Sequence, residues 1–307
     1  MAEPAPIEHA EHRCGFVALI GAPNVGKSTL INALVGAKVS IVTPKVQTTR
    51  ALIRGIAIAH GAQLIFVDTP GIFSPRRRLE RAMVGTALAS AQDADLVIVV
   101  IDARRGMMDD DERILRELAD LRAPKILVLN KIDLVDKPTL LPLTGKLNES
   151  ANFAATFMIS ALSGDGVADL KRWLAANVPA GPWLYPHDQI SDAPLRQLAA
   201  EMTREKLYLR LHQELPYQST VETEVWKELK DGSVRIEQTV YVARDSQRKI
   251  VLGKGGQTIK AIGAAARAEI AAAIEQPVHL FLHVKVREGW MDDPERYRAM
   301  GLEFPNE

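Results

Sequence analysis

The stretch Gly21-Ala22-Pro23-Asn24-Val25-Gly26-Lys27-Ser28 decides the fold of the first half of this chain. It follows an apolar run at 16–20 and precedes a helical pattern that opens at Thr29. The spacing matches G-x-x-x-x-G-K-[ST], a loop that cradles phosphates between a strand and a helix. Its backbone N–H groups converge on phosphate oxygens, its lysine supplies charge to the β and γ phosphates, and its serine hydroxyl can ligate Mg²⁺. We therefore predict that residues 21–29 bind the phosphates of a nucleotide.

Short apolar, β-branched runs alternate with longer helical stretches around this loop. The runs are 16–20, 64–67, 96–101, 126–129 and 156–159. Continuous apolar strands are buried on both faces, which is typical of a parallel sheet covered by helices. The pattern predicts an α/β phosphate-loop domain with a mostly parallel sheet.

A second phosphate-site motif, Asp68-Thr69-Pro70-Gly71, ends the run at 64–67, 40 residues after Ser28. Phosphate-loop folds place a carboxylate here to hold Mg²⁺, and the N–H of the glycine can meet the γ-phosphate. We assign all four residues to the phosphate site, with Ser28 and Asp68 as metal ligands.

The motif predicted to select the base is Asn130-Lys131-Ile132-Asp133, which follows the run at 126–129. The carboxylate of Asp133 can accept hydrogen bonds from both N1–H and the exocyclic amine of guanine, and adenine offers no such pair of donors. Sites built on such hydrogen bonds reject the wrong substrate by about 10⁴ to 10⁵. Ser160-Ala161-Leu162 would complete the pocket through the backbone N–H of Ala161. The sequence thus predicts a guanine nucleotide.

Proline, glycine and scattered aromatic residues dominate the stretch between Asn177 and Ser191, as in a connection between domains. We predict a flexible tail at 1–13, a nucleotide domain at 14–180, a linker at 181–193 and a second domain at 194–307. The second domain reads as α-β-β-α-α-β. Its elements are a helix at 195–213, strands near 221–225 and 234–242, two helices, and a last strand at 278–286. Asp231-Gly232 between the first two strands favours a type I′ hairpin turn.

Gly253-Lys254-Gly255-Gly256 separates the last two helical patterns, and this arrangement resembles a type II KH domain with its G-x-x-G loop. Small residues let the loop clamp about four nucleotides of RNA backbone. Residues 244–267 carry six basic side chains and one acidic side chain. A helix-breaking turn is the alternative interpretation. The predicted RNA-binding residues are Arg248, Lys249, Gly253, Lys254, Gly255, Gly256 and Lys260.

One GTPase domain followed by one KH domain resembles the Era family, within the translation-factor-like GTPases. Further stretches carry this resemblance: Val39-Ser40-Ile41-Val42, Gln47-Thr48-Thr49-Arg50, Tyr185-Pro186, Glu214-Leu215-Pro216-Tyr217 and Gly289-Trp290. The resemblance implies Mg²⁺-dependent GTP hydrolysis, binding to the 3′ region of small-subunit ribosomal RNA, and a part in 30S subunit maturation. It also implies peripheral inner-membrane contact in some members, and we expect the protein to be a cytoplasmic monomer.

The same resemblance assigns a switch segment, Gln47 to Arg50, and a second switch position at Ile72. Thr49 takes the third metal-ligand role, with Thr48 as the alternative. Ile72 stands where Ras-like relatives carry the glutamine that orients water, so hydrolysis must be activated differently. In one branch of the family, the residue matching Asn24 helps to hold K⁺ beside the phosphates. The alternative is that Asn24 only stabilises the loop.

The composition is that of an ordinary globular protein of about two domains. The chain has 307 residues, with 38 Lys and Arg balancing 38 Asp and Glu. RNA contact must therefore come from a local basic patch. A single cysteine, Cys14, excludes an intrachain disulfide, and the longest apolar run, 96–101, is far shorter than the ~20 residues that span a bilayer.

Two other functions stay open: an RNA-binding checkpoint module with incidental hydrolysis, and a membrane or cell-cycle signalling GTPase. The triplet Arg76-Arg77-Arg78 reads as a solvated loop, or alternatively as an RNA or activator contact.

Overall fold

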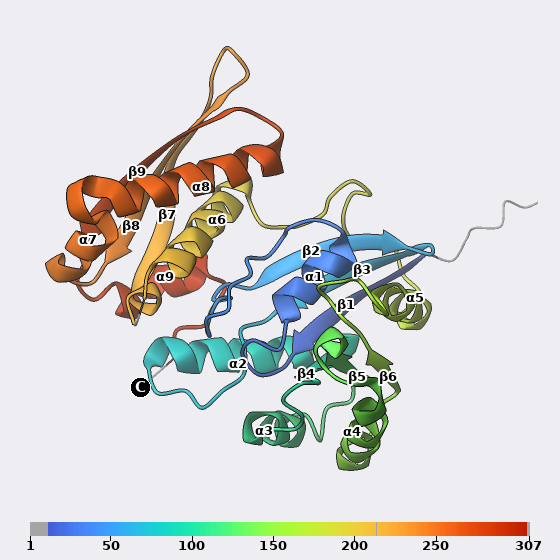
Figure 1. Cartoon of the computed structure of the whole chain (residues 1–307). Helices are drawn as coiled ribbons and strands as arrows, with labels where there is room; N and C mark the ends of the chain where they lie inside the picture. The colour runs from blue at the N-terminus through green and yellow to red at the C-terminus, as the bar shows by residue number, and fades with distance from the viewer. Residues whose placement is uncertain (1–11, 213, 306–307) are drawn as a thin grey trace, which may run out of the picture. The chain divides into compact units, whose positions relative to one another are not determined.

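The computed structural model describes residues 12–212 and 214–305, so residues 1–11 of the predicted tail lie outside the described part (Figure 1). The chain divides into two compact units. The first contains the chain up to Ala37, Arg54–Asp68 and Ala87–Asp192, and the second contains Lys38–Ile53, Thr69–Thr86 and the chain from Ala193 onward. The segments after the phosphate loop and after Asp68 therefore group with the C-terminal half of the chain. The predicted domain limits did not include this grouping, and they stay predictions.

The first unit is built on a six-stranded sheet with the order β2-β3-β1-β4-β5-β6. Strand β1 pairs in parallel with β3 and β4, β4 with β5, and β5 with β6. Strands β3 and β4 are buried along their whole length, as their continuous apolar sequences predict. The mostly parallel α/β fold is confirmed. The bounds are β1 Arg13–Ile20, β2 Ile53–Ala59, β3 Ala62–Asp68, β4 Leu96–Asp102, β5 Lys125–Asn130 and β6 Ala155–Met158.

Strand β2 was missed in the sequence. It lies at the edge of the sheet, and an exposed Arg54 and a glycine interrupt its apolar pattern. A two-residue turn joins it to β3, with positive φ at His60 (49°) and Gly61 (79°). So short a connection reverses the chain, so β2 runs antiparallel to β3.

The helices of the first unit follow the parallel strands. Helix α1 begins at Lys27, two residues before the predicted start at Thr29. Gly26 is its N-cap and Gly36 is its C-cap. Helix α2 begins in the second unit and ends in the first. The bounds are α1 Lys27–Val35, α2 Arg78–Gln92, α3 Asp109–Glu117, α4 Lys137–Ser150 and α5 Val167–Asn177.

The second unit confirms the predicted order α-β-β-α-α-β. Strands β7 and β8 pair antiparallel, and β8 and β9 pair parallel. Apolar side chains of α6 and α8, such as Leu207, Met202 and Ile262, pack with Ile236 and Val240 of β8 in two neighbouring clusters. Helix α9 was not predicted. The bounds are α6 Leu195–Arg210, β7 Ser219–Glu228, β8 Val234–Val242, α7 Asp245–Leu252, α8 Gln257–Ile274, β9 Val278–Val286 and α9 Pro294–Ala299.

The hairpin between β7 and β8 forms where it was predicted, but its turn is not type I′. Only Gly232 in this turn has a positive φ (80°), whereas type I′ needs two such residues. The N–H of Gly232 donates to the carbonyl of Leu229 (3.1 Å), and the N–H of Leu229 donates to the carbonyl of Ser233 (2.8 Å). The loop is therefore a three-residue connection with glycine at its left-handed position.

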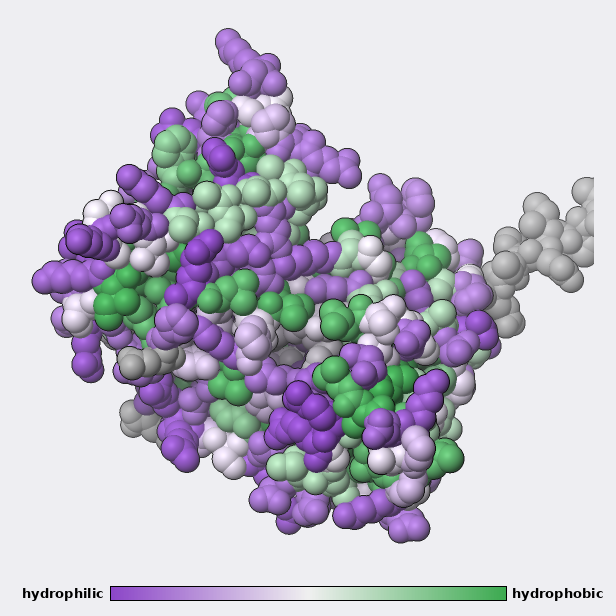
Figure 2. Space-filling view, viewed as in Figure 1, coloured by the Kyte–Doolittle hydropathy of each residue, from purple (hydrophilic) through white to green (hydrophobic). Residues whose placement is uncertain are grey.

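On the face shown in Figure 2, hydrophilic and hydrophobic residues are interspersed. Within residues 12–212 and 214–305, no helix combines the length and apolar character needed to cross a membrane.

Candidate functional site

The phosphate loop connects β1 to α1, as the sequence predicts. The side chain of Lys27 is buried and folds back over the loop. Its Nζ donates to the carbonyls of Gly21 (2.9 Å) and Ala22 (3.0 Å). Asn24 and Gly26 take left-handed backbone conformations, with φ of 64° and 101°. These contacts place one buried ammonium group where the motif requires a phosphate partner.

Burial lowers the pKa of Lys27 to about 8, although the carboxylates of Asp68 and Asp111 partly oppose this effect. Bound phosphates add negative charge beside the ammonium group, and this favours its protonated form. Nucleotide binding should therefore be coupled to proton uptake by this lysine.

We expect GTP binding to take up about half a proton at pH 8, because about half of the free protein then holds a neutral Lys27. The same linkage weakens the apparent affinity about fivefold between pH 8 and pH 9. Titration calorimetry in two buffers of different ionisation enthalpy measures the uptake. Equal heats in the two buffers at pH 8 would contradict the expectation.

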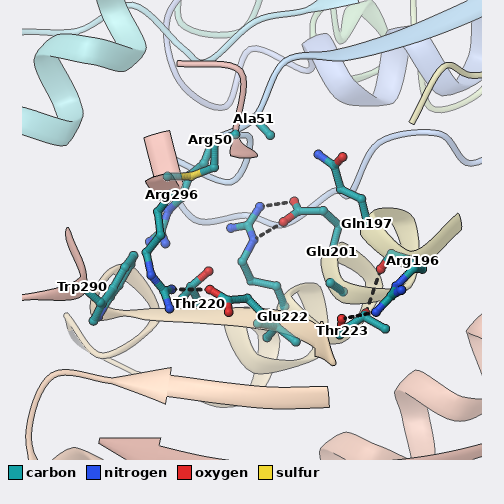
Figure 3. Close-up of a pocket in the computed structure, with 14 residues that line it drawn as sticks. Arg50, Ala51, Arg196, Gln197, Glu201, Thr220, Glu222, Thr223, Trp290 and Arg296 are labelled. Carbon is teal, nitrogen blue, oxygen red and sulfur yellow. Dashed lines mark hydrogen bonds and ion pairs between the residues drawn. The ribbon is translucent and has the colours of Figure 1, made fainter. Parts of the chain in front are cut away.

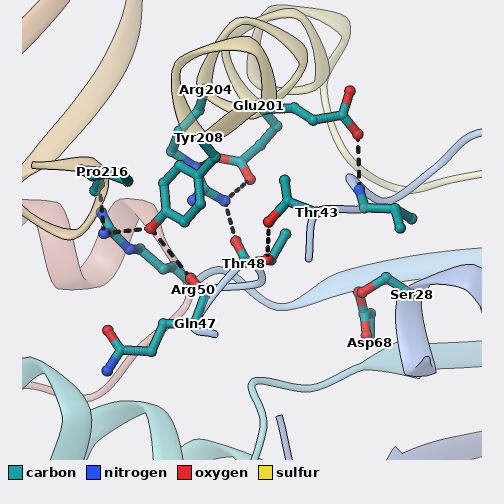
Figure 4. Close-up of polar contacts among 12 residues, drawn as sticks. Ser28, Thr43, Gln47, Thr48, Arg50, Asp68, Glu201, Arg204, Tyr208 and Pro216 are labelled. Carbon is teal, nitrogen blue, oxygen red and sulfur yellow. Dashed lines mark hydrogen bonds and ion pairs between the residues drawn. The ribbon is translucent and has the colours of Figure 1, made fainter. Parts of the chain in front are cut away.

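A candidate metal site lies where β3 ends. The hydroxyl of Ser28 donates to Oδ2 of Asp68 at 2.9 Å, and the carboxyl group of Asp68 is fully buried (Figure 4). Hydroxyl and carboxylate oxygens are ligands that Mg²⁺ prefers. This pair of residues therefore fits a nucleotide-bound Mg²⁺ ion. Thr69, which follows Asp68, is also buried.

Asn130 joins the base motif to the phosphate loop. Its side-chain N–H donates to the carbonyl of Val25 (2.9 Å). Its Oδ1 accepts from the N–H groups of Lys131 (2.8 Å) and Ala161 (2.9 Å). A single buried amide therefore fixes three loops, and its own contacts here are to protein.

Lys131 also stabilises the site, through contacts that include Asp102, a residue that was not predicted from the sequence. Its Nζ donates to the carbonyl of Asn24 (2.6 Å) and to Oδ2 of Asp102 (2.7 Å). Asp102 is 3% exposed at the end of β4. The sequence does carry one indication of Asp102: it is an acidic residue that ends an apolar run, and the next apolar run along the chain leads into the base motif.

The remaining predicted guanine residues lie on the loops after β5 and β6. Asp133 is exposed within the 3₁₀ turn Ile132–Leu134. Ser160 and Ala161 are buried, whereas Leu162 is 84% exposed. The N–H of Ala161, which we expected to serve the base, donates to Asn130 in this structure. The base-binding roles of these residues stay predictions.

The predicted switch residues belong to the second unit. Both hydrogen-bonding partners of the Thr48 hydroxyl lie in its own loop: Thr43 Oγ1 (2.6 Å) and the carbonyl of Lys45 (2.7 Å). The side chain of Thr49 is 7% exposed. Ile72 is fully buried, and its apolar side chain has no group that could orient water. Which of Thr48 and Thr49 ligates the metal ion stays a prediction.

The G-x-x-G loop joins α7 to α8 as predicted. Gly253 has a φ of 71°, and a Cβ there would lie 2.2 Å from Oγ1 of Thr258, so only glycine fits without a shift. Gly255 (59°) and Gly256 (77°) also have positive φ. The loop and its flanking helix ends expose four basic side chains: Arg248, Lys249, Lys254 and Lys260.

Two family models match the two halves of the chain. Residues 16–131 match the model described as "50S ribosome-binding GTPase", and residues 214–291 match the model described as "KH domain". Each match covers the corresponding candidate site, the nucleotide motifs up to Lys131 in the first and the G-x-x-G loop in the second.

Curated relatives match the whole chain. GTPase Era of Afipia carboxidovorans is 67% identical over 308 residues, which covers 100% of each chain. GTPase Era of a Bradyrhizobium species is 68% identical over 298 residues, or 97% of each chain.

Two solved structures are 38% identical to this chain with a TM-score of 0.89, and each match covers 94% of this chain and 99% of the other. One is a variant of Aquifex aeolicus Era bound to GDP·AlF₄⁻. The other is Era in complex with MgGDPNP and nucleotides 1506–1542 of 16S ribosomal RNA.

Proposed function

This chain belongs to the Era family of GTPases, and from this premise we propose that it couples a Mg²⁺-dependent GTP cycle to binding of the 3′ region of 16S ribosomal RNA. The proposed cellular role is assistance to 30S subunit maturation. One observation carries the proposal: a relative that matches 94% of this chain was solved with both MgGDPNP and that RNA region.

We assign Mg²⁺ to Ser28 and Asp68, whose oxygens lie 2.9 Å apart, and to Thr49. A bound Mg²⁺ would neutralise charge on the β and γ phosphates. Lys27 supplies a buried positive charge to the same phosphates, and the backbone of residues 21–28 orients them. Catalysis of this kind depends on positioning and charge, and needs no side-chain nucleophile.

Activation of the attacking water is left to groups other than Ile72. The K⁺ role proposed for Asn24 would add positive charge beside the phosphates. In this structure the backbone carbonyl of Asn24 accepts a hydrogen bond from Lys131, which is a loop-stabilising contact. The K⁺ role therefore stays a prediction, as do the monomeric state, the cytoplasmic location and the peripheral membrane contact.

We propose that the G-x-x-G loop contacts the RNA backbone. Lys254 is exposed, and the loop leads into α8 through Gly256. Positive charge and free backbone N–H groups at a helix N-terminus both attract phosphate. Close approach of the main chain requires small residues, which the three glycines supply.

The variant Lys254→Asp/Gly255→Asp should bind a 3′-terminal 16S RNA fragment at least about tenfold more weakly at 0.15 M salt, because it reverses charge where the phosphates approach. GTP affinity should stay within about twofold. Filter binding with labelled RNA and calorimetry with GTP measure the two effects.

A matched control lies in the β7–β8 hairpin. Lys230→Asp/Gly232→Asp makes the same change of charge at another exposed lysine and at another positive-φ glycine, and neither Gly255 nor Gly232 has an atom within 4 Å of an added Cβ. The control should bind RNA nearly as wild type does. Equal RNA affinity in the two double variants would refute the assignment.

A further inference from the structure

The predicted switch residues Gln47 to Arg50 lie within the longer stretch 38–53, which groups with the KH half of the chain in one compact unit and is called the switch segment from here on. Its contacts flank Thr49 on both sides. The Nζ of Lys45 donates to the carbonyls of Tyr208 and Leu211 at the end of α6. Arg204 of α6 donates through Nη2 to the carbonyl of Thr48 (2.5 Å). The backbone just before Thr49 is therefore fixed by α6.

Arg50, directly after Thr49, makes the most extensive of these contacts (Figure 4). Its side chain is 3% exposed. Nη1 donates to the carbonyl of Ser219 (2.9 Å), and Nη2 donates to the carbonyls of Pro216 (3.2 Å) and Tyr217 (2.8 Å). A guanidinium group presents several donors in one rigid plane, so this cage of carbonyls defines its position more strictly than a lysine could.

Tyr208 completes the attachment of Arg50 to α6. Its hydroxyl accepts from Nη2 of Arg50 (2.7 Å) and donates to the carbonyl of Gln47 (3.3 Å). The ring of Tyr208 is fully buried, and the guanidinium carbon of Arg50 lies 5.6 Å from its centre. One tyrosine of α6 thus contacts both ends of the predicted switch motif.

A second attachment secures the start of the segment. Glu205 of α6 is buried, and it accepts from the N–H of Val42 (2.8 Å) and from Nζ of Lys38 (2.7 Å). Burial works to raise the pKa of this carboxyl group, but hydrogen bonds from Lys206, Lys38 and Val42 hold it below its usual value. The carboxylate therefore stays ionised at neutral pH, and the start of the segment stays attached.

We propose that Arg50 is a positioning residue for Thr49: α6 and the 216–219 turn of the KH half hold Arg50, and thereby set the place of the threonine that ligates Mg²⁺. The inference rests on the proposed metal role of Thr49. It adds that the KH half orders the switch segment of the GTPase, since this segment takes its conformation from contacts with that half.

The test uses full-length chains with Arg50→Gln, Arg50→Lys and Thr49→Ala. The control is Arg196→Gln. Arg196 and Arg50 line the same cavity of about 360 Å³, and Arg196 also donates to carbonyls, those of Thr223 (3.0 Å) and Glu224 (2.9 Å), but not to the switch segment (Figure 3). Arg196 is exposed, so this control separates the loss of a cationic donor to backbone carbonyls in the same unit from the loss of the attachment of the switch segment.

Arg50→Gln should raise the Mg²⁺ concentration for half-maximal GTP hydrolysis about tenfold, which corresponds to about 1.4 kcal/mol, and leave GDP affinity within about twofold. Arg50→Lys should recover part of the loss, since a lysine can still donate to some of the carbonyls. Arg196→Gln should match wild type. An unchanged Mg²⁺ response in Arg50→Gln, with a shifted response in Thr49→Ala, would overturn the inference.

Hydrogen exchange separates this inference from the proposed metal role. If Thr49→Ala leaves the Mg²⁺ response unchanged, the metal role fails. Positioning by Arg50 is then judged by the exchange of backbone amides 42–50. Faster exchange in Arg50→Gln than in Arg196→Gln supports it, and equal exchange overturns it.

Discussion

Asp133→Asn is expected to reverse the base preference from GTP to XTP. The wild-type carboxylate can accept hydrogen bonds from both N1–H and the exocyclic amine of guanine. An asparagine amide keeps one acceptor, but turns its NH₂ group toward that amine. Xanthine carries a carbonyl at this position, so the asparagine can accept from N1–H and donate to the carbonyl.

The size of the reversal follows from the hydrogen bonds at stake. Each hydrogen bond to a charged group is worth about 1.5–3 kcal/mol. Two of them correspond to about 10² to 10⁴ in affinity. The fold should be unaffected, because Asp133 is exposed and backbone bonds hold its turn, from Ile132 N–H to Ile159 (3.2 Å) and from Leu134 N–H to Lys131 (3.0 Å).

Calorimetric titration of GTP, XTP and ATP into both proteins measures the reversal. Asp136→Asn is the matched control, since Asp136 is also exposed and its side chain makes no capping hydrogen bond to α4. It should keep the wild-type order of affinities. If Asp133→Asn still prefers GTP, or if the wild type binds ATP as tightly as GTP, the guanine assignment fails.

The nucleotide motifs could be predicted because their chemistry is local in sequence. Lys27, Ser28 and the G-x-x-G glycines sit at strand–helix and helix–helix junctions, and short spacing rules capture such junctions. Asp102 could not be predicted in the same way, because its partner, Lys131, is 29 residues away and meets it only after β4 and β5 pair. Its function depends on sheet topology, which no local motif records.

The switch segment shows a second limit of prediction from sequence. The motif identified Gln47 to Arg50 as a unit, yet nothing in these residues indicates that Arg50 is buried among carbonyls of residues 216–219. That contact spans 166 to 169 residues. The edge strand β2 was missed because an exposed Arg54 and a glycine interrupt its apolar pattern, and α9 was missed because it has only six residues; the place of each depends on packing more than on its own periodicity.

Gly26→Ala is expected to lower GTP affinity at least about 100-fold. Gly26 has a φ of 101°, and a Cβ there would lie 2.3 Å from Nδ2 of Asn130. That same Nδ2 holds the carbonyl of Val25 at 2.9 Å. An added methyl group would push the Asn130 amide away, and the amide is what ties the phosphate loop to the base motif. Both halves of the nucleotide site would therefore lose their shared support.

Gly36→Ala separates this clash from backbone strain, because it alters the other end of the same helix. Gly36 also has a positive φ (84°), but an added Cβ meets no described atom within 4 Å. Both variants bear the cost of a left-handed alanine, about 1–2 kcal/mol, and both should show a lower Tm. Only Gly26→Ala should lose GTP affinity beyond about threefold, as measured by calorimetry. Equal losses would mean that strain in α1, and not the contact between Gly26 and Asn130, governs nucleotide binding.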